Sequence, residues 1–147
     1  MLKYAKRIRH KLNKLMKSSP IYNKLQHYLI ECGEADFSLA EEIILRIISV
    51  CSTYLSRHNV EHATVMQLLP RTQTRNCTVA KYNNIVRHAN NFLKEQIKSV
   101  PGLHYWNIYG VKYTTVNIFQ DGVHFNQIGL QRYYRNVRGA IIQSLVY

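Results

Sequence analysis

Short apolar segments alternate with long amphipathic ones along this chain. Residues 63 to 69, ATVMQLL, form a continuous run that stops at Pro70, as is typical of a buried parallel strand. Residues 103 to 106 and residues 28 to 32 are two further strand candidates. Parallel strands need long crossover connections, and helices between them supply these. The sequence therefore predicts an α/β fold of three α/β/α layers, with a small, mostly parallel sheet.

Four segments carry apolar residues at helical spacing. The first covers residues 2 to 17 and is rich in Lys and Arg. The second begins at Ser38, a candidate N-cap, and ends at Asn59. The third stops before Pro101, and the fourth follows the candidate cap Asn126. The apolar stripes predicted to face the core are Leu39, Ile43, Ile47, Val50, Cys51 and Tyr54 in the second segment, Val79, Tyr82, Val86, Ala89, Leu93 and Ile97 in the third, and Leu130, Tyr134, Val137, Ile141 and Leu145 in the fourth.

Positive charge is concentrated near the start of the chain. The formal net charge is +12, and residues 1 to 30 hold eight Lys or Arg and no Asp or Glu. We predict a basic amphipathic helix and linker over residues 1–20 and one α/β domain over residues 21–147. The basic helix can bind the phosphate backbone of nucleic acid, as can Arg132, Arg135 and Arg138 on the last helix. A solvated helix face and a mitochondrial transit peptide are the other interpretations of the N-terminal segment.

Cysteine usage and hydropathy bear on the compartment. Cys32, Cys51 and Cys77 form an odd set without C-x-x-C spacing, which argues against a disulfide framework and for a reducing environment. No apolar run approaches the ~18 residues that cross a bilayer. The sequence therefore predicts a soluble, cytoplasmic (intracellular) protein with no membrane partner.

An aspartate and a histidine stand three residues apart where a turn leads into the last helix. In Asp121-Gly122-Val123-His124 the carboxylate can accept the imidazole N–H and leave the other ring nitrogen free as a base. Histidine titrates near neutrality, which suits proton transfer. The same spacing also fits a structural role, in which Asp121 starts an Asx turn and His124 packs at the helix end. The spacing alone leaves both roles open.

The residues around this pair resemble the last sequence block of the SGNH (GDSL-type) hydrolases. Residues 121 to 126, DGVHFN, precede Gly129 and a helix rich in Tyr and Arg. The block is especially similar to the esterase-like domains that accompany invertebrate retrotransposon proteins. Upstream, residues 65 to 71 (VMQLLPR) are similar to the family's central strand, and residues 28 to 38 (YLIECGEADFS) to its strand ending in Gly-x-Asn-Asp. The resemblance implies the flavodoxin-like SGNH hydrolase fold, truncated at the N-terminus.

The resemblance also implies roles for individual residues. His124 matches the family's general base and Asp121 the carboxylate that orients it. Gly33 and Asp36 match the Gly and Asp of the third block, but Ala35 stands where the family has the Asn that donates to the oxyanion. The family's nucleophilic serine lies in a Gly-Asp-Ser turn after the first strand, and this chain contains no Gly-Asp-Ser.

These departures leave three functional hypotheses. The first is an SGNH-type esterase-like domain that is truncated or catalytically degenerate and needs no cofactor. The second is a working hydrolase of small esters with an unconventional nucleophile, for which Ser18 and Ser19 are the candidates. The third is a non-catalytic basic binding module on a hydrolase scaffold, with nucleic acid as its partner and a retroelement as its origin.

Residues 58 to 62 carry two histidines and a glutamate at the spacing of a zinc motif. His58-Asn59-Val60-Glu61-His62 fits the letters of the inverted zinc-protease motif H-x-x-E-H. That motif needs both histidines on one helical face, whereas the helix here is predicted to end at Asn59. We therefore predict no metal site, and expect one histidine at a helix end and the other before a strand.

Overall fold

The computed structural model describes residues 37–75, 77–111 and 116–146. Several expectations fall outside these ranges, so they remain predictions. They are the basic helix and linker of residues 1–20, the strand of residues 28–32, Ser18, Ser19, Gly33, Ala35 and Asp36.

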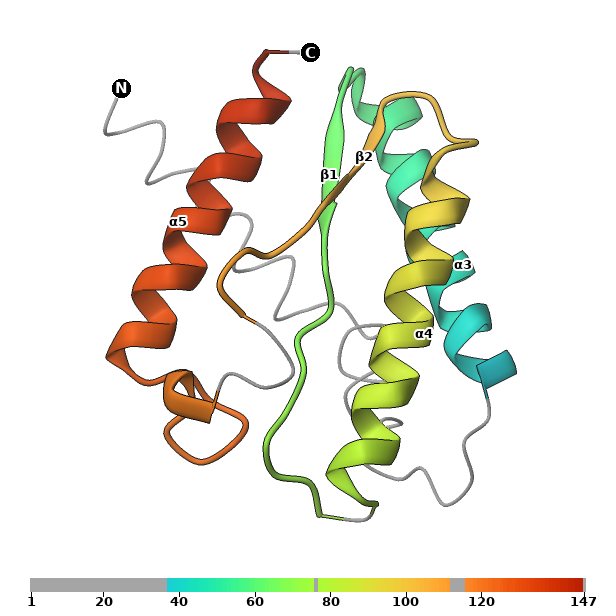
Figure 1. Cartoon of the computed structure of the whole chain (residues 1–147). Coiled ribbons are helices and arrows are strands. Elements are labelled where there is room, and N and C mark those ends of the chain that lie inside the picture. The colour runs from blue at the N-terminus through green and yellow to red at the C-terminus, as the bar shows by residue number, and fades with distance from the viewer. Residues whose placement is uncertain (1–36, 76, 112–115, 147) are drawn as a thin grey trace.

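The described part of the chain contains a parallel two-stranded sheet. β1 (Ala63–Met66) pairs with β2 (Leu103–Trp106) in a register that runs from Ala63 opposite Leu103 to Met66 opposite Trp106. The connection between them includes helix α4 (Val79–Ile97). Helices α3 (Phe37–His58) and α4 lie on one side of the strands, and α5 (Gln127–Ser144) lies on the other (Figure 1). The predicted α/β fold with a small parallel sheet between helices is confirmed.

Helices α3 and α4 form the main apolar core with one face of the sheet. The core-facing stripe predicted for α4 is correct from Tyr82 to Ile97, whereas Val79 at the first position is 36% exposed. The stripe predicted for α3 is partly wrong, because Val50 and Tyr54 are exposed. Apolar residues occur on several sides of α3, and its packing against α4 selects the face to be buried. The buried residues of this core are Ala40, Ile43, Ile44, Ile48, Tyr82, Ile85, Val86, Ala89, Leu93, Ile97 and Leu103.

Helix α3 ends where the sequence predicts, but it begins earlier. Asn59 follows its last residue with a φ of 50°, a left-handed conformation that asparagine tolerates at helix ends. At the other end, Ser38 is the second helical residue and not the N-cap, because the helix already begins at Phe37.

Helix α5 packs against the opposite face of the sheet through small residues. Its N-cap is Asn126, as predicted, and the Asn126 side chain accepts a hydrogen bond from Gly129 N at 2.9 Å. The predicted apolar stripe is wrong, since Leu130, Tyr134, Ile141 and Leu145 are exposed. The buried residues of α5 are Gly129, Asn136 and Ala140.

Steric contacts explain why α5 turns its small residues inward. A Cβ atom on Gly129 would lie 2.2 Å from the carbonyl oxygen of Ile118, and one on Gly139 would lie 2.7 Å from the Trp106 ring. Real Cβ atoms do not approach other atoms so closely, so the two glycines allow the helix to sit near the backbone and the indole. Several larger apolar side chains of α5, such as Leu130 and Ile141, therefore face outward, whereas Tyr133 packs inward against a cluster that includes Ile118.

Two buried asparagines of α4 hold the extended segment that follows β1. The Asn90 side chain accepts from Leu68 N at 2.8 Å and donates to Leu68 O at 3.0 Å. Asn83 makes the same pair of hydrogen bonds to the backbone of Arg71, at 2.9 and 2.8 Å. Each side-chain amide thus takes the place of a neighbouring strand, because it pairs with both the backbone N–H and the C=O of one residue. The segment stays extended beyond the end of β1.

The segment of residues 111 to 119 lies between β2 and α5. Residues 112–115 lie outside the described ranges, and Val116–Ile118 form the short 3-10 helix η1. Ile118 and Phe119 are buried in a second apolar cluster, on the α5 side of the sheet, together with Ile108 and Val111. None of the helices in the described ranges combines the length and the apolar character needed to span a bilayer.

Candidate functional site

Asp121 and His124 lie in the loop between η1 and α5. The loop is closed at its base by an antiparallel bridge between Phe119 and Phe125, whose rings stack with centroids 5.3 Å apart. Gln120 N donates to His124 O at 2.8 Å and fastens the two sides of the loop. The three residues between Gln120 and His124 therefore form a tight turn, and the chain then leads into the capped N-terminus of α5.

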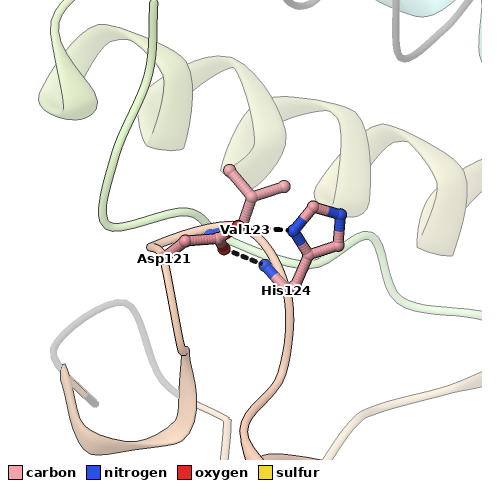
Figure 2. Close-up of polar contacts among 3 residues, drawn as sticks. All are labelled: Asp121, Val123 and His124. Atoms are coloured by element: carbon pink, nitrogen blue, oxygen red, sulfur yellow. Dashed lines mark hydrogen bonds and ion pairs between the residues drawn. The ribbon is translucent and has the colours of Figure 1, made fainter.

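The two side chains form a hydrogen-bonded pair (Figure 2). His124 Nδ1 lies 2.6 Å from Asp121 Oδ2. The other carboxylate oxygen, Oδ1, accepts from the backbone N–H groups of Val123 at 3.0 Å and of His124 at 2.7 Å. Asp121 therefore starts an Asx turn with one oxygen and contacts the imidazole with the other. The Asx turn and the Asp–His contact are therefore present together, whereas His124 does not pack at the helix end, since its side chain is 78% exposed.

The hydrogen bonds around Asp121 keep its carboxylate charged. They hold the pKa of the carboxyl well below its ordinary value, chiefly through the backbone N–H of His124, then through the His124 side chain and the N–H of Val123. A carboxylate that accepts the Nδ1–H leaves Nε2 of a neutral imidazole with its lone pair. Nε2 lies on the side of the ring away from Asp121 (Figure 2), and the His124 side chain is 78% exposed. A proton donor can thus approach it from solvent.

Gly122 braces this loop against the segment that follows β1. Its φ is 80°, and a Cβ atom there would lie 2.5 Å from the Cβ of Gln73. Gly122 O also accepts from Thr72 N at 2.9 Å. Since Thr72 comes one residue after the peptide unit held by Asn83, the Asp121 loop lies beyond the carboxyl end of β1. That is where sites occur in parallel sheets.

The rest of a hydrolytic site is not seen beside this pair. Within residues 37–75, 77–111 and 116–146, Asp121 is the side chain that hydrogen-bonds the His124 ring, and no hydroxyl or thiol does so. The oxyanion-region residues Gly33, Ala35 and Asp36 and the serines at 18 and 19 lie outside those ranges. Of the sequence-predicted site, the structure brings together the acid and the base.

A histidine pair near the amino ends of the strands was missed by sequence reasoning. His62 Nδ1 lies 3.1 Å from His104 Nε2. Partial burial, and then the neighbouring His62, lower the pKa of His104. His104 pairs with Thr64 in the sheet, so His62, two residues before Thr64, shares its face. The strand register is the signal that joins the two histidines, and it is unknown before the fold.

The described residues offer no metal centre. No three His, Cys, Asp or Glu side chains in that part of the chain come together as candidate ligands. The H-x-x-E-H letters do not form a zinc motif, because α3 ends at His58 and β1 begins at Ala63. His62 therefore lies before a strand, as the sequence predicts.

The described residues thus define a small α/β domain that carries an exposed Asp–His pair on a loop at the end of β1. Comparisons with protein-family models, with curated proteins and with solved structures found no match for the chain. The resemblance to SGNH hydrolases therefore depends on the sequence blocks, and on the geometry of the pair within the last of them.

Proposed function

We propose that this chain is an SGNH-type esterase-like domain that is catalytically degenerate. It keeps the acid–base pair Asp121–His124, and it lacks both the Gly-Asp-Ser nucleophile turn and, at Ala35, the oxyanion asparagine. The observation that carries the proposal is the 2.6 Å contact between His124 Nδ1 and Asp121 Oδ2 on a loop at the carboxyl end of a parallel strand.

The arrangement has what a catalytic acid–base pair needs from its scaffold. The carboxylate is locked by two backbone N–H groups, so it does not rotate away from the imidazole. The loop is fixed by the close approach of Gly122 to Gln73. Such a pair withdraws a proton from a hydroxyl, which then attacks an ester carbonyl. These features support an origin in a hydrolase and exceed what a simple Asx turn requires.

The missing groups decide the level of activity. A triad without its nucleophile keeps at most ~10³–10⁴-fold acceleration over water, and this remainder comes from the oxyanion hole and binding. Loss of one oxyanion donor removes a further ~10²–10³. Together these factors leave about 1- to 100-fold acceleration, so we expect ester hydrolysis near the rate of the uncatalysed reaction.

The first test is hydrolysis of p-nitrophenyl acetate by the full chain and by its His124→Ala variant. We expect the two proteins to hydrolyse the ester at rates equal within about twofold, since a general base accelerates little when no nucleophilic hydroxyl is within its reach. A fluorophosphonate probe is expected to label no serine. Turnover that disappears in His124→Ala, or a single labelled serine, would show a working hydrolase and overturn the degenerate assignment.

The pair itself can be tested separately from activity. Nitrogen-15 NMR of the imidazole of His124 is expected to show the Nδ1–H tautomer in the wild type and a shift toward Nε2–H in Asp121→Ala, which removes the acceptor. The Val123→Ala variant keeps the carboxylate and its backbone donors and serves as the control. Identical tautomers in wild type and Asp121→Ala would remove the support for an acid–base pair.

A basic binding module is the second candidate function. It is favoured by the charge of residues 1 to 30 and by α5, which carries three arginines and no acidic residue. Of these, Arg135 and Arg138 are exposed, as predicted, and Arg132 is half-buried. Nucleic-acid binding that weakens with salt and is lost when Lys3, Arg7, Lys11 and Lys14 are neutralised is the expected result. Binding that is absent or insensitive to salt would exclude this function.

A further inference from the structure

An open pocket of about 420 Å³ lies between α5 and the chain that leaves β2. The end of β2 runs toward α5, as Figure 1 shows. Neither Asp121 nor His124 lines the pocket, so it is a feature separate from the site described above. The residues that line it are Trp106, Tyr109, Gly110, Arg132, Arg135 and Asn136.

Two aromatic rings form one side of this pocket. The rings of Trp106 and Tyr109 are nearly perpendicular, at 86°, with centroids 6.1 Å apart. Tyr109 is 69% exposed, so its ring offers a free face to a ligand. A planar aromatic ligand stacked on Tyr109 would turn an edge toward Trp106, and stacked and edge-to-face contacts are the arrangements that aromatic groups prefer.

Two arginines form the other side. Arg132 Nη1 donates to Gly110 O at 3.0 Å, which holds this guanidinium at the rim and leaves its remaining donors for a ligand. Arg135 is exposed and makes no ion pair with the acidic residues of the described ranges. Among the described residues no acidic side chain lines the pocket, so none of them neutralises its charge locally. Guanidinium groups in this state are suited to phosphate, which they can bind with two parallel hydrogen bonds.

The pocket is fixed in shape by a buried asparagine. The Asn136 side chain accepts from Tyr109 N at 2.7 Å and from Trp106 Nε1 at 3.3 Å. It donates to Tyr109 O and to Arg132 O, both at 2.9 Å. The Asn136 side chain thus connects Trp106 and Tyr109 to α5, the helix that also carries Arg132. A ligand would meet walls that are already in place, which lowers the entropic cost of binding.

We propose that this pocket binds a nucleotide unit, with the base stacked on Tyr109 beside Trp106 and the phosphate held by Arg132 and Arg135. The unit can be a free nucleotide or part of a single-stranded nucleic acid, because the stacking and phosphate chemistry is the same. The assignment depends neither on ester chemistry nor on the basic residues of the N-terminal segment.

Trp106 is the single tryptophan of the chain, so its fluorescence reports directly on the pocket. The full chain is titrated with AMP, with a ten-residue oligothymidylate, with adenosine and with inorganic phosphate. We expect AMP or the oligonucleotide to quench Trp106, and phosphate alone to leave it unchanged at the same concentration. Quenching by AMP indicates a free-nucleotide site, and quenching by the oligonucleotide alone indicates a nucleic-acid site. No quenching by either, or equal quenching by inorganic phosphate, would overturn the proposal.

Paired variants separate the pocket from general charge and from loss of folding. Arg135→Ala and Tyr109→Ala are each expected to weaken binding at least about fivefold. Arg138→Ala removes the same charge one turn along α5 and outside the pocket, and Tyr109→Phe keeps the aromatic ring, so both are expected to bind within about twofold of wild type. Equal losses in Arg135→Ala and Arg138→Ala would show nonspecific attraction and refute the pocket. Neutralising Lys3, Arg7, Lys11 and Lys14 tests the N-terminal segment and leaves quenching by AMP intact.

Discussion

The two faces of the sheet are covered in different ways. On one face, α3 and α4 bury large aliphatic residues such as Ile44, Ile85 and Leu93, each at most 1% exposed. On the other face, α5 approaches through Gly129, Gly139 and Ala140 and is held by hydrogen bonds of side chains. The first face is stabilised by apolar area, and the second by close fit and polar contacts.

The difference also separates stability from candidate function. The pocket, the Asp121 loop and the exposed apolar residues of α5 all belong to the side with the smaller apolar interface. Because α5 is held by a few directed contacts, its arginines can line a pocket together with Trp106 and Tyr109. Helices α3 and α4 instead use their side chains to form the apolar core. The α3 and α4 side therefore acts as the support, and the α5 side carries the groups that can meet a ligand.

Truncation of a core leucine should have the largest effect. We expect Leu93→Ala in α4 to lower the free energy of unfolding by ~2–5 kcal/mol, because it leaves a cavity in a packed core. The matched variant Leu130→Ala in α5, where the leucine is 42% exposed, should cost less than about 1 kcal/mol. Urea denaturation followed by circular dichroism measures both values. Equal costs would mean that α5 buries its apolar stripe after all.

Removal of the Asn136 side chain should have an intermediate effect. Asn136→Ala leaves the N–H and C=O of Tyr109 without their partners, and because these groups are only part-buried we expect a cost at the lower end of the ~1–3 kcal/mol found for buried groups. The emission of Trp106 should change in the same variant, since its indole loses a hydrogen bond. Gln131→Ala, at an exposed position of α5, is the control and should leave both the unfolding free energy and the emission near wild type. An unchanged emission spectrum in Asn136→Ala would contradict the hydrogen bond between Trp106 and Asn136.

The smallest effect concerns pH on the α5 side of the sheet. Because the folded protein lowers the pKa of His104, the unfolded chain binds more protons below about pH 6.5. The contribution of His104 to stability is therefore present above that pH and is lost as the pH falls through the lower pKa of the folded state. His104→Gln should flatten the dependence of the unfolding free energy between pH 7 and pH 5. Parallel pH curves for wild type and variant would show that the histidine pair has no such role.

Sequence reasoning located most elements but not which face each helix buries. It correctly predicted β2, the start of β1, the cap of α5 and the end of α3, because turn residues and caps act over a few neighbouring positions. The predicted strand of residues 63 to 69 is too long, since β1 ends at Met66. It also placed Asp121 and His124 together, since three residues of a turn set their separation. It failed for the stripe of α5, because apolar periodicity identifies a face but not its partner, and Gly129 and Gly139 allow a closer approach on a different face. The His62–His104 pair and the Trp106 pocket depend on strand register and on contacts between distant segments, so no local pattern reveals them.

The sequence alone determined the alternation of strands and helices, the excess of positive charge and the Asp–His turn, because these depend on residues close together in the chain. The tertiary structure decided that α5 turns Gly139 to Trp106 of the sheet, Gly129 to Ile118 of η1 and Leu130 to solvent. It also decided that Trp106, Tyr109, Arg132 and Arg135 meet in one pocket. The physical reason is that steric fit between segments far apart in the chain selects among faces that hydrophobic periodicity alone leaves equivalent.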